Sequence, residues 1–150
     1  MQHKAGWVAH RYESMGKKLG FTIGINVFGA GLSIAHRGTI VVHNKAKIGA
    51  NCRLHICVNI GAQLGEADAV PRIGDNCYIA PGAKLFGNIR LGDNVVIGAN
   101  AVVNKSFPDG NVTLGGVPAH VLSYKSSADR IPKGCLESEV TTGFRSQLGG

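Results

Sequence analysis

His36 stands out as a candidate catalytic residue because it interrupts a series of aliphatic residues. An aliphatic residue returns every six positions at Val42, Ile48, Leu54 and Ile60, and one step back in this count falls on His36. The unperturbed pKa of histidine is about 6.5, so an imidazole can accept a proton near neutral pH. The interruption indicates a general base, with a satisfied interior or interface histidine as the alternative.

Two further histidines lie close to His36 in the sequence. His55 follows 19 residues later, so it could reach the same cleft and bind an acceptor molecule; a surface or interface position is the alternative. His43 is expected in a turn. A zinc site would need three converging histidines, and the spacing of these three does not provide them, so we expect no metal.

The cysteines do not indicate a metal site either. No CxxC pair of the kind that binds metals is present. Free thiols in a cytoplasmic protein are the simpler interpretation. The four cysteines are Cys52, Cys57, Cys77 and Cys135.

Length and composition limit the class of protein. A chain of 150 residues, 44% hydrophobic and 17% charged, is typical of one globular domain. The chain has 16 Lys and Arg residues against 9 Asp and Glu residues, which gives a net charge of +7. The basic residues are scattered and only 6% of residues are aromatic, which favours small polyanionic ligands over nucleic acid. No apolar stretch approaches the roughly 18 residues of a membrane span. We therefore expect a cytoplasmic protein without membrane insertion.

The candidate residues lie within a repeat of six residues. From Ile73 the chain reads IGDNCY, IAPGAK, LFGNIR, LGDNVV, IGANAV and VNKSFP, and an earlier block keeps the same phase. The first residue of each unit is aliphatic and the fifth is apolar, a position that Cys52 and Cys77 share. This period fits short strands joined by turns, with three units per triangular coil and residues 18 apart stacked. The sequence therefore predicts a mainly β protein with a parallel β-helix.

The repeat is bounded and interrupted at definite places. Residues 21–122 are predicted to form the β-helix domain, with the regular phase ending near the turn signal at residues 108–110. From Ile60 to Ile73 is 13 residues where six would continue the coil, so residues 62–72 must leave it as an excursion loop.

The two ends of the chain lack the repeat. Residues 1–20 are predicted to form a short amphipathic helix that closes the N-terminal end of the coil. Residues 123–150 are expected to be an irregular C-terminal extension. The apolar residues of the predicted helix are Trp7, Val8, Tyr12 and Met15.

Three phrases of the sequence resemble the hexapeptide-repeat acyltransferase superfamily. They are AHRGTIVV, IGDNCYIAPGAKLFGNIRLGDNVVIGANAVVNKSFP and GGVPAH. Within that superfamily the chain is most similar to serine acetyltransferases and their relatives in polysaccharide-biosynthesis clusters. The resemblance implies a left-handed β-helix, a homotrimer, and acetyl-CoA bound between the coils of adjacent subunits.

The resemblance also implies roles for individual residues. His36 matches the catalytic histidine of the superfamily, which acts as the general base. Lys105 is a suitable phosphate partner. His120 replaces an arginine that is often found at its position. The residues implied in binding acetyl-CoA are Pro81, Ala99, Asn104, Lys105 and His120.

The chain departs from the serine acetyltransferase pattern around His36. Ala35 replaces an aspartate directly before the histidine, no Asp or Glu occurs from residue 14 to residue 65, and Val70 replaces a second histidine before a proline. Another group must then orient His36. The candidates are a backbone carbonyl, the amides of Asn26 and Asn44, and the loop carboxylates of Glu66 and Asp68, which with His55 are also candidate acceptor-binding residues.

These departures shape the expected function. Because the residues that hold an amino acid are replaced, we expect an acetyl-CoA-dependent O-acetyltransferase whose acceptor is a sugar hydroxyl in cell-surface polysaccharide biosynthesis. Serine O-acetylation in cysteine biosynthesis is the alternative. A non-catalytic structural β-helix module is the alternative of another class, and it predicts flat Thr-rich faces that this chain lacks.

Overall fold

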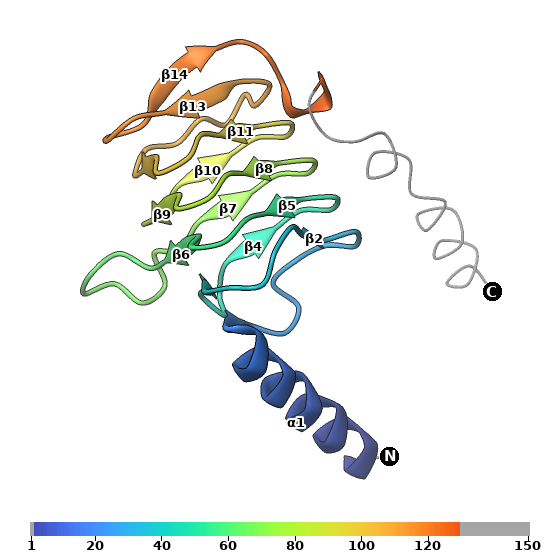
Figure 1. The fold of residues 1–150 in the computed structure, drawn as a ribbon. Helices are drawn as coiled ribbons and strands as arrows, with labels where there is room; N and C mark the ends of the chain where they lie inside the picture. The colour runs from blue at the N-terminus through green and yellow to red at the C-terminus, as the bar shows by residue number, and fades with distance from the viewer. Residues whose placement is uncertain (1, 130–150) are drawn as a thin grey trace, which may run out of the picture.

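The computed structural model describes residues 2–129, which form one α-helix and short β-strands, so this part of the chain is mainly β (Figure 1). The helix is α1 (Gln2–Leu19). The strands are β1 (Phe21–Ile23), β2 (Ser33–Ile34), β3 (Ile40–Val42), β4 (Lys47–Ile48), β5 (Arg53–Leu54), β6 (Asn59–Gly61), β7 (Arg72–Ile73), β8 (Tyr78–Ile79), β9 (Lys84–Phe86), β10 (Arg90–Leu91), β11 (Val96–Ile97), β12 (Val102–Val103), β13 (Thr113–Gly115) and β14 (His120–Ser123). A short 3-10 helix, Ser127–Asp129, ends the described chain.

The strands wind around a coil and contribute in turn to three sheets. Sheet A has the order β1-β3-β6-β9-β12, sheet B has β10-β7-β4, and sheet C has β14-β13-β11-β8-β5-β2. Every strand pair in them is parallel except β13 with β14. This is the β-helix that the repeat of six predicts, and Figure 1 shows its coils stacked one above another.

Small apolar side chains fill the inside of the coil. Leu54, Ile79 and Ile97 lie in register on neighbouring strands of sheet C, and each has no exposed surface. Cys52 and Cys77, at the fifth positions of their repeats, are equally buried. A hydrogen bond with Cys52 and burial raise the pKa of the Cys77 thiol, and both side chains fill the core.

Asparagines hold the corner between sheets B and C. Asn51, Asn76, Asn94 and Asn111 all have φ between 52° and 59°, a left-handed conformation that asparagine tolerates better than most residues. Asn76 Nδ2 donates a hydrogen bond to Asn94 Oδ1 (3.1 Å), and Asn94 Nδ2 donates one to Asn111 Oδ1 (3.0 Å). The coils are thus tied together at this corner by side chains as well as by the strand ladders.

Helix α1 extends away from the N-terminal end of the coil (Figure 1). The Tyr12 hydroxyl donates a hydrogen bond to the carbonyl oxygen of Ile23 in β1 (3.0 Å). Trp7, Val8 and Met15 remain 61%, 60% and 52% exposed. These apolar side chains of the helix are therefore not buried against the end of the coil, where the sequence predicted a closing helix. Within residues 2–129 no helix is both long and apolar enough to cross a membrane.

The coil continues beyond the turn at residues 108–110, where the sequence predicted the regular phase to end. Strand β13 pairs in parallel with β11, and the chain then reverses into β14. The following residues return to the side of the coil, where Ser127 N donates a hydrogen bond to the carbonyl oxygen of Asn94 (3.1 Å). The rest of the predicted extension, residues 130–150 with Cys135, lies outside the described residues.

Candidate functional site

His36 lies in a widened corner of the coil. The prediction that it occupies a position in the inward aliphatic column is wrong. Ile34 of β2 is in register with Leu54, so Ile34 takes the inward position. Five residues separate Ile34 from Ile40, whereas three separate Leu54 from Val58 in the next coil. The two extra residues shift the count of six, and they leave His36 exposed on the corner.

The corners between sheets C and A form one edge of the coil, which we call the histidine edge. It consists of the segments that join β2 to β3, β5 to β6, β8 to β9 and β11 to β12. These segments carry His36, His55, Pro81 and Ala99 in that order. The last two lie on neighbouring coils, because Asn100 N donates a hydrogen bond to the carbonyl oxygen of Pro81 (2.9 Å). Four residues chosen from the sequence therefore lie along one edge.

His55 is packed between two rings on this edge. Its ring centroid lies 6.1 Å from that of His36, at an interplanar angle of 58°, and 5.0 Å from that of Tyr78. The Nε2 atom of His55 is buried and has no hydrogen-bond partner among the described residues. Burial lowers the pKa of His55, and the charge of Arg53 and the neighbouring imidazole of His36 lower it further. The imidazole of His55 is therefore neutral at pH 7.

Arg53 adds a positive charge beside the histidines. It is in register with Ser33 and Tyr78 on sheet C, and its Nη1 donates a hydrogen bond to Ser33 Oγ (3.2 Å). The one ion pair within residues 2–129 joins Lys45 and Asp68, so Arg53 has no carboxylate partner there. The sequence reasoning missed Arg53 and Tyr78, although both lie directly before an inward aliphatic residue of the repeat.

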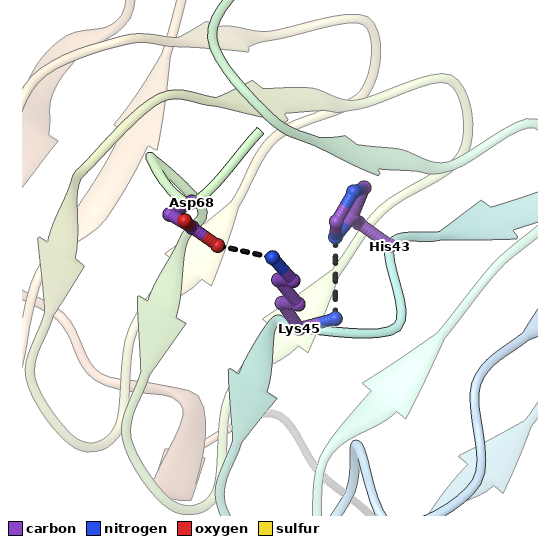
Figure 2. A network of polar contacts seen from close by, with 3 residues as sticks. All are labelled: His43, Lys45 and Asp68. Carbon is purple, nitrogen blue, oxygen red and sulfur yellow. Dashed lines mark hydrogen bonds and ion pairs between the residues drawn. The ribbon is translucent and has the colours of Figure 1, made fainter. Parts of the chain in front are cut away.

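The corners between sheets A and B form a second edge, which we call the loop edge. The excursion between β6 and β7 leaves the coil there. Lys45 Nζ donates a hydrogen bond to Asp68 Oδ1 in the loop, and the Lys45 backbone N donates one to His43 Nδ1 (3.2 Å) (Figure 2). The hydrogen bond and charge of Lys45 hold the pKa of Asp68 below its usual value. His43 thus has the turn role that the sequence indicated.

The side-chain candidates for orienting His36, two amides and two carboxylates, are not found at its corner. Asn26 and Asn44 precede strands or bridges of sheet B, and Glu66 and Asp68 belong to the excursion loop, so all four lie on the loop edge. Within one chain the structure does not bring them to His36, because the two edges bound opposite sides of sheet A. His55 is the candidate residue that lies next to it.

The residues implied in acetyl-CoA binding are divided between the two edges. Pro81 and Ala99 are on the histidine edge, whereas Asn104 and Lys105 follow β12 on the loop edge and are exposed. His120 is the first residue of β14 and is also exposed. In the described part of the chain, no three His, Cys, Asp or Glu side chains are grouped so that they could hold a metal ion.

Comparison with known proteins agrees with this fold. The family model for the bacterial transferase hexapeptide (six repeats) matches residues 71–105. The serine acetyltransferase of Staphylococcus aureus (strain Mu50) is 40% identical over 95 residues, which are 63% of this chain and 44% of that protein. These matches confirm the resemblance to the hexapeptide-repeat acyltransferase superfamily.

Solved structures give the same result. The serine acetyltransferase of Neisseria gonorrhoeae superposes with a TM-score of 0.68 at 30% identity, over 82% of this chain and 51% of that one. The serine acetyltransferase of Brucella abortus strain S19 in complex with coenzyme A superposes with a TM-score of 0.63 at 34% identity, over 69% and 40%.

These matches correct the expected acceptor. The chain spans less than half the length of the curated relatives that it matches. Those relatives and the solved neighbours are serine acetyltransferases, so the expectation of a sugar hydroxyl in polysaccharide biosynthesis is wrong. The findings support the alternative, serine O-acetylation. The inference drawn from the replaced residues around His36 is therefore not supported by these relatives.

Proposed function

We propose that this hexapeptide-repeat chain transfers an acetyl group from acetyl-CoA to the hydroxyl of serine, with His36 as the general base. The observation that carries the proposal is the position of His36. It is exposed at one end of the histidine edge, and the donor-binding candidates Pro81 and Ala99 are stacked further along the same edge. The similarity to serine acetyltransferases supports the choice of donor and acceptor.

The chemistry requires little more than a base and a positioned acceptor. The thioester is already activated, so the serine oxygen attacks its carbonyl carbon while the imidazole of His36 takes the hydroxyl proton. The tetrahedral intermediate then breaks its C–S bond, and the imidazolium of His36 gives the proton to the leaving thiolate. Such general-base assistance typically contributes about 10²–10⁴-fold to the rate.

Arg53 supplies a group that an amino-acid acceptor needs. A guanidinium binds a carboxylate through two parallel hydrogen bonds, and Arg53 has no carboxylate partner among residues 2–129. Arg53 lies in β5, two residues before His55 on the histidine edge, and its charge lowers the pKa of that histidine. We assign Arg53 to the carboxylate of serine, in place of the residues that other serine acetyltransferases use.

The assembly expected from the sequence remains part of the proposal. Asn104 and Lys105 lie on a different edge from Pro81 and Ala99, and a donor bound between adjacent subunits of a homotrimer would contact both edges. We therefore retain a left-handed β-helix, a homotrimer and a cytoplasmic location. Sedimentation analysis measures the oligomeric state directly, and a stable monomer would contradict this arrangement.

The proposed function is tested by thiol release from acetyl-CoA in the presence of serine. We expect turnover by the wild-type protein and a loss of at least about 10²-fold in His36→Ala, the lower end of the contribution of a general base. His43→Ala is the matched control, because His43 lies in a turn of the loop edge and should leave the rate unchanged. Unchanged activity in His36→Ala, or no turnover of serine by the wild type, would refute the proposal.

A further inference from the structure

His36 needs a partner that fixes its ring, and within residues 2–129 the ring of His55 lies next to it. An imidazole acts well as a base when one ring nitrogen is held by a hydrogen bond and the other faces the substrate. The residue before His36 is an alanine, and the carboxylates and amides suggested by the sequence lie on the loop edge. His55, on the neighbouring coil of the histidine edge, is the adjacent residue with a ring nitrogen.

We propose that His55 is the positioning residue for His36, and that its Nε2 accepts a hydrogen bond from a ring N–H of His36. The inference rests on the proposed function of His36 as the base. It replaces the carboxylate of related enzymes with a neutral imidazole. The second nitrogen of His36 is then left free to take the proton of the serine hydroxyl.

The distance between the two rings fits this role. Two imidazoles joined by an N–H···N bond of ordinary length have centroids about 5 Å apart. The observed separation is 6.1 Å, so a movement of about 1 Å closes the hydrogen bond. His36 can make this movement, because it is exposed in a corner that is two residues longer than the one above it.

The surroundings of His55 keep its nitrogen available as an acceptor. A buried polar atom without a partner is unfavourable, and among residues 2–129 Nε2 of His55 is such an atom. The Tyr78 ring packs against the imidazole at 5.0 Å and fixes its orientation. The charged and titratable groups around the pair are Arg53 from β5, Tyr78 from β8 and Arg37 beside His36. None of them is a carboxylate that would compete for His36.

The proposal predicts different effects for two substitutions of His55. His55→Gln keeps a side-chain oxygen that can accept the hydrogen bond, whereas His55→Leu removes the acceptor and fills a similar volume. We expect His55→Leu to lower kcat about 10- to 100-fold, less than the full contribution of the base. The KM for serine should change less than twofold, and the acid limb of the kcat/KM profile should move to lower pH. His55→Gln should retain at least about a third of the wild-type kcat. His43→Leu, a half-buried histidine on the loop edge, is the matched control.

A second measurement does not depend on turnover. ¹⁵N NMR of the imidazole nitrogens follows the titration of His36 directly, and His55→Leu should change it while His43→Leu should not. If the wild type fails to acetylate serine but the two histidines titrate as a coupled pair, the proposed function is wrong and the pairing stands. If the wild type is active but His55→Gln loses as much activity as His55→Leu, His55 acts through packing. That result, or an unchanged titration of His36 in His55→Leu, would overturn the pairing.

Discussion

The assignment of Arg53 to the acceptor carboxylate can be tested by removing the charge from the enzyme and from the substrate in turn. We compare wild type and Arg53→Gln with two acceptors, serine and serinamide, which differ only in the carboxylate. Thiol release from acetyl-CoA gives KM and kcat for each of the four combinations. If guanidinium and carboxylate pair, removing either one should weaken binding, and removing the second should add little.

The structure sets the size of the effect. A hydrogen bond to a charged group contributes about 1.5–3 kcal/mol when it is well desolvated. Arg53 is only half-buried, so solvent screening places the expected loss near the lower end of that range. About 1.4 kcal/mol corresponds to tenfold in affinity. We therefore expect the KM for serine to rise about tenfold in Arg53→Gln, and the KM for serinamide to be about equal in the two proteins.

The assay should be run at pH 8 to isolate this contact. The charge of Arg53 contributes to the lowered pKa of His55, so Arg53→Gln lets His55 take up a proton more easily. At pH 8 His55 is neutral in both proteins, and any difference then comes from the acceptor. Arg90→Gln, which removes a similar charge from the outer face of sheet B, is the matched control. An equal loss with serine and serinamide in Arg53→Gln would refute the assignment.

Three further predictions concern stability. Because burial lowers the pKa of His55, the unfolded chain binds more protons than the folded chain below pH about 6.5. The free energy of unfolding, measured by urea denaturation, should therefore fall from pH 7.5 to pH 5.5. The fall should be smaller in His55→Gln. Leu54→Ala, in a fully buried position, should lower the free energy of unfolding by about 3–5 kcal/mol, measured by the same method. Asn94→Ala should cost about 2–4 kcal/mol, since it removes two side-chain hydrogen bonds and places alanine at φ 59°. Asn94→Gly should cost less than Asn94→Ala, because glycine adopts that φ freely; the reverse order of melting temperatures would contradict this account.

The coil could be predicted from the sequence because its cause is local and repeated. Each unit of six must turn its first and fifth residues inward, so the buried residues and the strand pairings follow from counting, as Leu54 and Ile79 show. The count failed at His36, where two added residues widen the corner and Ile34 takes the inward place. An insertion of two residues in a turn leaves no mark in an aliphatic pattern when another aliphatic residue lies nearby.

The members of the candidate site were harder to predict than the proposed base. His36 could be selected from its phrase, and Pro81 and Ala99 from their spacing of 18. Arg53 could not, because an outward arginine on a β-helix is usually a solvated charge. Its significance depends on the residues of the coils above and below, and on the lack of a carboxylate partner within residues 2–129. Which edge each residue occupies is set by the number of residues in every preceding corner.

The position of His36 in the first complete coil is compatible with the base role that we propose for it. A corner of three residues, such as the one that contains His55, is held between the coils above and below it, so its side chains have fixed neighbours. The corner that contains His36 borders the end of the coil: within residues 2–129 one coil is stacked on it along sheet C, and Gly38 N donates a hydrogen bond to the carbonyl oxygen of Leu19 (3.3 Å). It can therefore be longer at little cost to the ladder. His55, which is packed between two rings, then has the exposed His36 beside it, and the base that we propose, which must meet both a partner and an incoming hydroxyl, would use that combination.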